Sequence, residues 1–259
     1  MRFSDESLAR RLEAVSDRYM LEWLSGTGAE LQRFGGAVAA VDSSRPELDF
    51  VNRVYGLWPE DAERVGEIVH SYRDRGVRGW FELAPCEGFP RLAEALADAG
   101  AAQVGYHAVL CGPAQPLEPA LDVAEVGAAD VALFADVLLR GHGVPEAERE
   151  RDPASIERWL GIEGWRLYLA RVEGEVAGAA VLTIGDGLGQ LANASTVPEY
   201  RGRGVQTALI ARRLTDAAAS RCELACSSAV FGSTSQRNLE RAGLRVAYTK
   251  AVWRLAERG

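Results

Sequence analysis

The chain has 259 residues, of which 47% are hydrophobic and 25% are charged, a composition typical of globular proteins and unlike that of disordered or fibrous chains. Acidic residues exceed basic residues by 37 to 29, so the chain as a whole lacks the positive charge of a nucleic-acid-binding protein. No apolar run approaches the ~20 residues that span a bilayer, and the polar, acidic N-terminus is unlike a signal peptide. We therefore expect a cytoplasmic protein with no membrane or nucleic-acid partner, folded as about two domains of roughly 100–200 residues each.

The first 111 residues alternate between helical and strand-like periodicity. Leu8, Leu12 and Val15 recur at three- and four-residue steps, which predicts a helix that Ser4 can cap. A further helix begins at Pro59, because proline suits the first turn of a helix. In chain order, the pattern predicts the first helix, strands at 36–41 and 48–57, the helix from 59 to about 76, a strand at 79–84, a helix at 90–99 and a strand at 103–110.

Residues 112–120 contain three prolines and show no periodicity, which predicts a linker between two domains. Beyond this segment, Glu173 and Gly174 separate two alternating runs, a pattern typical of a β-hairpin. In chain order, we expect a strand at 121–126, helices at 128–140 and 152–160, hairpin strands at 165–172 and 175–184, a strand at 190–197, a helix at 204–219, a strand at 222–229, a helix at 235–242 and a strand at 246–255.

Cysteine and histidine residues are dispersed along the chain. Cys222 and Cys226 form no CxxC pair, and on one strand their Cα atoms would be about 13 Å apart. This separation is too large for a disulfide or a shared zinc ion. The histidines His70, His107 and His142 form no HExxH motif. We therefore expect no metal site.

Part of the first half of the chain repeats in the second half. Leu-Ala-Asp-Ala-Gly at 96–100 matches Leu-Glu-Arg-Ala-Gly at 239–243, and Pro59-Glu60 matches Pro198-Glu199 in the same order. This agreement predicts an internal repeat. The two copies differ after the Pro-Glu pair, where only the second copy contains the sequence Arg-Gly-Arg-Gly.

The segment 201–207, Arg-Gly-Arg-Gly-Val-Gln-Thr, lies between a predicted strand and a predicted helix. Glycines there let the backbone approach a ligand, and the free N–H groups of a helix start attract anions such as pyrophosphate. The segment matches neither the nucleotide P-loop nor the GxGxxG pattern. The alternatives to an anion-binding loop are an ordinary glycine-rich turn with solvated arginines and an arginine-glycine RNA-binding segment. Lys250 is the only lysine, so the remaining basic side chains are all arginine.

Two motifs resemble those of the GCN5-related N-acetyltransferase (GNAT) superfamily. Residues 197–210, which contain the Arg-Gly-Arg-Gly sequence, look like motif A, and residues 235–244 look like motif B. The resemblance implies an α/β fold with a mixed sheet, in which 121–259 is a complete GNAT domain. Residues 1–111 resemble only the later half of that fold and lack the phosphate loop. They look like a degenerate copy in a tandem arrangement, joined by the linker at 112–120.

The resemblance also implies a cofactor and a reaction. Acetyl-CoA would donate an acetyl group to a primary amine of a small molecule or peptide, which attacks the thioester directly. The backbone of Thr196 and Val197 would hold the pantetheine arm, and the helix carrying Ser235 and Asn238 would line its other side. The pyrophosphate would bind the amides of the phosphate loop, which are those of Arg201, Gly202, Arg203, Gly204, Val205, Gln206 and Thr207.

Two departures from the family pattern concern chemistry. Gln206 stands where glycine or alanine is usual, and Leu239 stands where many members have a tyrosine that protonates the leaving thiolate. The catalytic candidates are His142, which has a suitable pKa range as a base, and Tyr248, for which a structural role is the alternative. These departures leave a second hypothesis open, a non-catalytic acyl-CoA-binding or structural module. The first domain could cap the acceptor site or form a homodimer.

Overall fold

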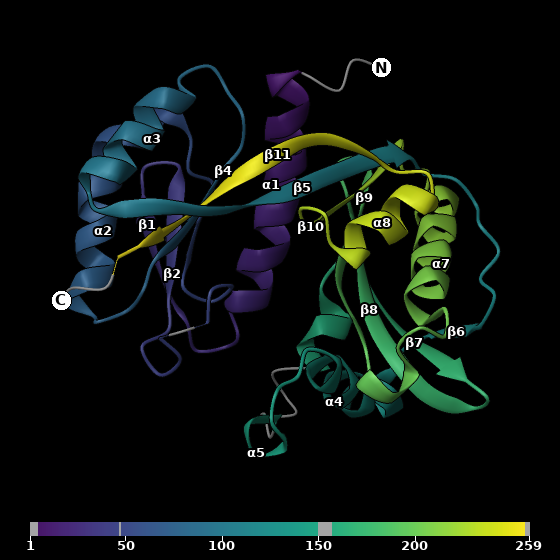
Figure 1. Cartoon of the computed structure of the whole chain (residues 1–259). Coiled ribbons are helices and arrows are strands. Elements are labelled where there is room, and N and C mark those ends of the chain that lie inside the picture. Colours follow the sequence, from purple (N-terminus) through teal and green to yellow (C-terminus); the bar gives the residue numbers. More distant parts are fainter. Residues whose placement is uncertain (1–4, 47, 150–156, 257–259) are drawn as a thin grey trace. The chain divides into compact units, whose positions relative to one another are not determined.

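The computed structural model, shown in Figure 1, describes residues 5–46, 48–149 and 157–256. The chain forms two compact units. Unit 1 comprises Met1–Val109 with Ala247–Gly259, and unit 2 comprises Leu110–Val246. Two strands, β5 (Ala101–Pro113) and β11 (Arg245–Leu255), contribute residues to both units. The boundaries between the two units fall at residues 109–110 and 246–247, whereas the expected linker is at 112–120. No helix in the described ranges is long and apolar enough to cross a membrane.

Unit 1 opens with helix α1 (Glu6–Leu24), whose N-cap is Asp5, because the Asp5 side chain accepts a hydrogen bond from the Ser7 amide. The expected Ser4 cap lies outside the described residues. The strands of unit 1 are β1 (Glu30–Phe34), β2 (Ala37–Val41), β3 (Arg53–Tyr55) and β4 (Trp80–Leu83), followed by parts of β5 and β11. Its other helices are the 3-10 helix η1 (Pro59–Arg64), α2 (Val65–Asp74) and α3 (Phe89–Asp98).

The sheet of unit 1 is mixed. Strands β1, β2 and β3 pair antiparallel in sequence, β3 pairs parallel with β4, and β4 pairs antiparallel with β11. The core lies between this sheet and helices α2 and α3, where Tyr72 and Phe81 are completely buried in edge-to-face contact. The side chain of Tyr72 also donates a hydrogen bond to the Ala40 carbonyl.

Two sequence-based predictions for unit 1 need correction. The strand expected at 48–57 is confined to β3, because the buried Asn52 side chain donates to the carbonyls of Arg45 and Leu48 and so stabilises a loop. Strand β1 was not predicted. Only Phe34 of its residues is buried, so it lacks the apolar alternation by which strands are recognised.

Unit 2 contains an antiparallel meander of β6 (Asp122–Glu125), β7 (Trp165–Val172), β8 (Glu175–Gly185) and β9 (Leu188–Thr196). Strand β10 (Leu224–Val230) adds to β9 in parallel. The hairpin turn predicted at Glu173 and Gly174 is confirmed, since both residues have positive φ. The predicted α/β class with a mixed sheet is therefore correct.

The helices of unit 2 pack on β8 and β9. Helix α4 (Val131–Gly141), preceded by the 3-10 turn η2 (Ala128–Asp130), approaches Ser195, whereas α7 (Val205–Ala219) approaches Gly178. Because Gly178 is adjacent to the strand partner of Ser195, the two helices cover opposite faces of the sheet. The remaining elements are α5 (Glu146–Arg149), η3 (Arg158–Gly161), η4 (Pro198–Tyr200) and α8 (Thr234–Arg241). Most of the helix expected at 152–160 lies outside the described residues, and 158–161 form the turn η3.

Candidate functional site

Strands β9 and β10 separate after a short paired segment. Leu224–Cys226 pair in parallel with Leu188–Gln190, and the rest of each strand lies beyond this register. Ser227 begins the separated part, and its hydroxyl donates to the Leu191 carbonyl at 2.7 Å. Past this point, the two strands form no further ladder pairs, so backbone donors and acceptors along this edge have no partner in the other strand. Such groups can bind an extended ligand through the same hydrogen bonds that a strand would make.

A β-bulge lies in the separated part of β9. The register passes from Ala180–Ala194 to Val181–Ala192, so Asn193 is the extra residue, and its φ is +32°. The guanidinium of Arg213 on α7 donates to the carbonyls of Val181 and Ala192 at 3.1 and 3.0 Å. Since Arg213 is only 2% exposed, these charge-assisted bonds are shielded from water. Arg213 therefore fixes the backbone on both sides of the bulge.

The C-terminal end of α4 positions His142 beside the bulge. A Cβ on Gly141 would lie 2.3 Å from the Ser195 hydroxyl oxygen and 3.0 Å from the Thr196 nitrogen, so only glycine permits this approach of helix to strand. The His142 Nε2 lies 2.9 Å from the Asn193 Oδ1. Because an amide oxygen only accepts, Nε2 is the donor, and the lone pair resides on Nδ1.

The pKa of the His142 imidazole lies below its ordinary value. Removal of water by the surrounding protein is the main cause, and the hydrogen bond with Asn193 opposes it in part. The residue nevertheless keeps an exposed surface. His142 is therefore neutral at neutral pH, which is the state that a general base requires.

The glycine-rich loop opens helix α7. Gly202 and Gly204 have φ of +78° and +81°, and no atom lies within 4 Å of the position that a Cβ would take at either residue. The first N–H groups of α7 have no acceptor inside the helix, and the helix dipole adds positive potential there. The amides of Arg201 and Arg203 donate to the Pro198 and Tyr200 carbonyls at 3.2 and 3.4 Å, so the donors that the loop offers a ligand are the remaining amides up to the first turn of α7, an arrangement that can bind phosphate groups.

Side chains of this loop have partners within the protein. Arg201 donates to the Gly141 carbonyl at 3.2 Å and so caps the C-terminal end of α4. Arg203 forms an exposed ion pair with Glu173 at 2.7 Å. Gln206 has a buried Oε1 that no described residue contacts by a hydrogen bond. Both arginine side chains are therefore already engaged by groups of the protein.

Helix α8 follows the separated end of β10. Ser233 caps it by accepting a hydrogen bond from the Gln236 amide, so α8 begins at Thr234, one residue before the predicted start. Ser235 is exposed in the first turn, and the Asn238 Oδ1 accepts a hydrogen bond from Arg241. Leu239 is 3% exposed and packs in the core of unit 2.

Comparison with known proteins agrees with this geometry. Residues 135–243 match the sequence model described as the Acetyltransferase (GNAT) family. This segment is a GNAT acetyltransferase domain. It extends from within α4 to the end of α8 and so includes the loop, the bulge and His142. The family resemblance expected from the two motifs is confirmed. No curated protein sequence matches the chain significantly.

Solved structures show the same fold over both units. A GCN5-related N-acetyltransferase from Kribbella flavida is 16% identical over 97% of this chain and 96% of its own, with a TM-score of 0.62. A GCN5-related N-acetyltransferase from Sphaerobacter thermophilus is 18% identical over 86% of this chain and 78% of its own, with a TM-score of 0.63. A tandem GNAT protein from the clavulanic acid biosynthesis pathway is 16% identical over 94% and 87%, with a TM-score of 0.65. At such identities the likeness establishes the fold alone.

Most of the expected site residues belong to unit 2, and the structure brings several of them together. Thr196, the loop 201–207 and His142 lie around the end of β9, as the contacts of Gly141 and Arg201 show. Tyr248 belongs to unit 1, where its buried hydroxyl donates to the Glu13 Oε1 at 2.7 Å. That contact favours the structural alternative for Tyr248.

Sequence reasoning missed two residues of the GNAT domain. It placed Asn193 on the strand without recognising the bulge, and it overlooked Arg213. The available signal for Arg213 was its position four residues after Leu209 and next to Leu214, on the apolar face of the predicted helix. A charged residue on such a face is either paired or bonded to backbone groups.

Proposed function

We propose that the GNAT domain transfers an acetyl group from acetyl-CoA to a primary amine of a small molecule or peptide by direct attack. The observation that carries this proposal is the open loop at Gly202 and Gly204, which leads into α7 directly beside the separation of β9 and β10. An anion-binding helix start next to two unpaired strand segments suits a ligand with a diphosphate and an amide-rich arm.

The residues present fit acetyl-CoA. The amides from Arg201 to Thr207 would hold the pyrophosphate, and the backbone of Thr196 and Val197 would hold the pantetheine arm. Ser235 and Asn238 would line the opposite side from α8. Gln206 adds a buried side-chain oxygen where the family usually has a small residue, and this oxygen could accept a hydrogen bond from the arm.

Bound acetyl-CoA supplies a thioester carbonyl that an amine can attack. An amine with a pKa of about 10 is mostly protonated at neutral pH, whereas a thiol with a pKa of about 8.5 leaves readily, so a base matters more than an acid. We assign this role to His142, whose Nδ1 would take the proton from the amine as the nitrogen–carbon bond forms. Asn193 holds the ring by accepting from Nε2. A positioned base is typically worth 10²–10⁴-fold in rate.

Coenzyme A binding tests the loop assignment by calorimetry on the full chain. Gly204→Asp places a carboxylate against the pyrophosphate and should weaken binding more than 100-fold, whereas the isosteric, neutral Gly204→Asn should retain most of the affinity, because asparagine tolerates positive φ. Gly127→Asp adds the same charge at an open position before η2 and serves as the control. Equal affinity of the wild type and Gly204→Asp would refute the placement.

A non-catalytic acyl-CoA-binding or structural module is the second candidate. It is favoured by Leu239, which is buried in motif B and offers no proton for the leaving thiolate. Thioester consumption measured across a panel of amines distinguishes the two functions. Tight coenzyme A binding without turnover of any amine would establish the module.

The remaining proposals concern organisation. We propose that 1–111 is a degenerate GNAT copy, separated by the linker 112–120 from the complete domain at 121–259, and that the protein is cytoplasmic and able to form a homodimer. The internal sequence repeat and the fold likeness that extends over both units support the tandem arrangement.

A further inference from the structure

Unit 1 contains a shallow cavity of about 330 Å³ that is widely open to solvent. It is lined by residues of α1, β1, β2 and the end of β3, and by glycines next to these strands, all of which belong to unit 1. Its wall is mostly apolar, and bare backbone at Gly36 and Gly56 completes it. The volume falls at the lower end of the range for small-molecule sites, which also combine an apolar wall with a few polar groups. Six of its lining residues enter the argument: Asp17, Leu21, Arg33, Val38, Tyr55 and Gly56.

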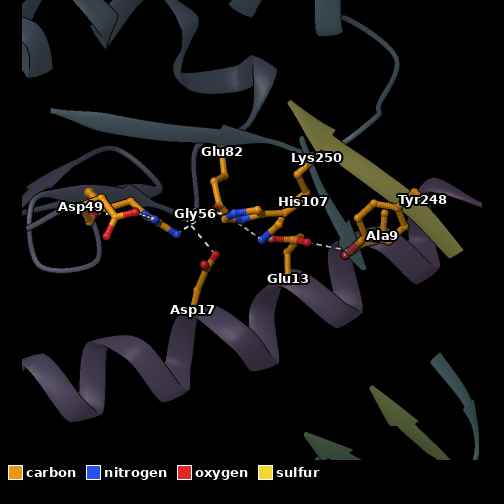
Figure 2. A network of polar contacts seen from close by, with 10 residues as sticks. Ala9, Glu13, Asp17, Asp49, Gly56, Glu82, His107, Tyr248 and Lys250 are labelled. Atoms are coloured by element: carbon orange, nitrogen blue, oxygen red, sulfur yellow. Dashed lines mark hydrogen bonds and ion pairs between the residues drawn. The ribbon is translucent and has the colours of Figure 1, made fainter. Parts of the chain in front are cut away.

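A buried charge cluster lies next to this cavity, and Figure 2 shows its members. Lys250 donates to Glu13 at 3.1 Å and to Glu82 at 2.5 Å. Glu82 also pairs with Arg53 and, at 2.8 Å, with His107. These cations hold the pKa of Glu82 well below its usual range despite burial, and the two carboxylates raise the pKa of Lys250. Each carboxylate of the cluster therefore has a cationic partner.

Asp17 is the exception. It lies one turn after Glu13 on the same side of α1, and both side chains project toward the strands (Figure 2). Among the described residues, only the Gly56 amide donates a hydrogen bond to the Asp17 carboxylate, at 2.9 Å, and no cationic side chain forms an ion pair with it. Asp17 thus places a carboxylate without a counter-ion at the wall of a cavity that solvent can enter.

Burial and the charged groups around Asp17 together determine its pKa. Burial and the neighbouring Glu13 raise its pKa to about 7, while Lys250 on β11 opposes this shift and Glu82 on β4 adds to it. Arg18 and Glu22 on α1 and Arg33 on β1 face the same cavity. A cation bound beside Asp17 would restore the ordinary ionised state of the carboxyl group.

Arg33 supplies the opposite charge. It is exposed at the cavity and forms no hydrogen bond or ion pair with any residue that the structure describes. A ligand with an ammonium group at Asp17 and a carboxylate at Arg33 would satisfy both groups, and its carbon skeleton would contact Leu21, Val38 and Tyr55.

We propose that the cavity of unit 1 binds a small zwitterionic amine with an apolar side chain, held by Asp17 through its ammonium group and by Arg33 through its carboxylate. An isolated cation leaves Arg33 without a partner, and an isolated anion is repelled by Asp17 when that group is ionised. All residues of this site belong to unit 1, and the proposal does not depend on the function proposed for the GNAT domain.

Calorimetry on the full chain at pH 8 tests the proposal with the apolar amino acids from alanine to phenylalanine. Each amino acid is compared with the amine and the acid that lack one of its charged groups. At least one amino acid should bind, and its amine and acid analogues should bind at least tenfold more weakly. Failure of every amino acid to bind overturns the proposal, as does equal binding of the analogues.

Two variants locate the ligand. Asp17→Asn keeps an acceptor for the Gly56 amide and should weaken binding at least tenfold, and Arg33→Gln should weaken binding of the amino acid more than that of its amine analogue. Asp98→Asn, an exposed carboxylate at the end of α3, is the matched control. Cooperative thermal unfolding at a melting temperature no lower than that of the wild type confirms that the variants are folded.

The pH dependence gives an independent readout. An ammonium group lowers the pKa of Asp17, so binding releases a proton below pH 7. Affinity for the amino acid should therefore rise by up to tenfold per pH unit as the pH increases toward 7, and should level off above it. An affinity that does not change between pH 5 and pH 7 would contradict the role of Asp17.

Discussion

Replacing Gly141 by alanine tests how α4 delivers His142 to the bulge. The new Cβ would lie 2.3 Å from the Ser195 Oγ and 2.5 Å from its Cβ, well inside contact distance, and 3.0 Å from the backbone nitrogen of Thr196. Because two of these atoms are backbone or attached to it, a rotamer change cannot relieve the clash, and α4 must move away from β9. Overpacking of this kind costs about 1–3 kcal/mol, and the better helix propensity of alanine returns about 0.5–1 kcal/mol.

The net loss of about 1–2 kcal/mol corresponds to about 4–8 °C in the melting temperature of a unit of this size. The movement also separates His142 from Asn193 and admits water to the ring, so the pKa of His142 should rise toward its ordinary value. Thermal unfolding and an NMR titration of the imidazole protons measure both effects. Gly127→Ala, at a position with open space around it, is the control. A Gly141→Ala protein with wild-type melting temperature and an unchanged His142 pKa would refute the reasoning.

Three further predictions concern buried or titrating groups. Arg213→Met leaves the carbonyls of Val181 and Ala192 without their donor, which should destabilise unit 2 by about 3 kcal/mol in urea unfolding; a loss below about 1 kcal/mol would show that other groups hold the bulge. If His142 is the base, kcat/KM for an amine substrate should fall as the pH drops through a pKa below 6.5, and His142→Gln should abolish this limb. The native pKa of Asp17, about 7, exceeds its ordinary value of 3.8, so its contribution to stability is lost as the pH rises from about 4 to 7. Asp17→Asn should therefore raise the melting temperature relative to wild type at pH 8 more than at pH 4, and the opposite sign would contradict the raised pKa.

Helices with regularly spaced apolar residues and recognisable residues at their ends could be predicted from the sequence. The helix expected at 204–219 is α7, and the helix expected at 235–242 differs from α8 by one residue at each end. The glycines at 202 and 204 also predicted a tight turn before α7, because their positive φ is a local property of the chain.

Features that depend on the register between strands could not be predicted. Asn193 becomes a bulge residue only through its pairing opposite β8, and Arg213 finds its carbonyl acceptors only once α7 packs on that bulge. The ion pairs of Glu13 and Lys250 join residues from opposite ends of the chain. Nothing in the local pattern around either residue specifies the other.

The single lysine of the chain has a practical consequence for studying unit 1. A lysine-specific protease can cut only after Lys250, which is 5% exposed and held by Glu13 and Glu82. Cleavage therefore requires β11 to leave the buried cluster, and its rate under native conditions measures the opening of that strand. The protein thus contains its own probe of local unfolding, which reports on unit 1 while residues 135–243 stay uncut.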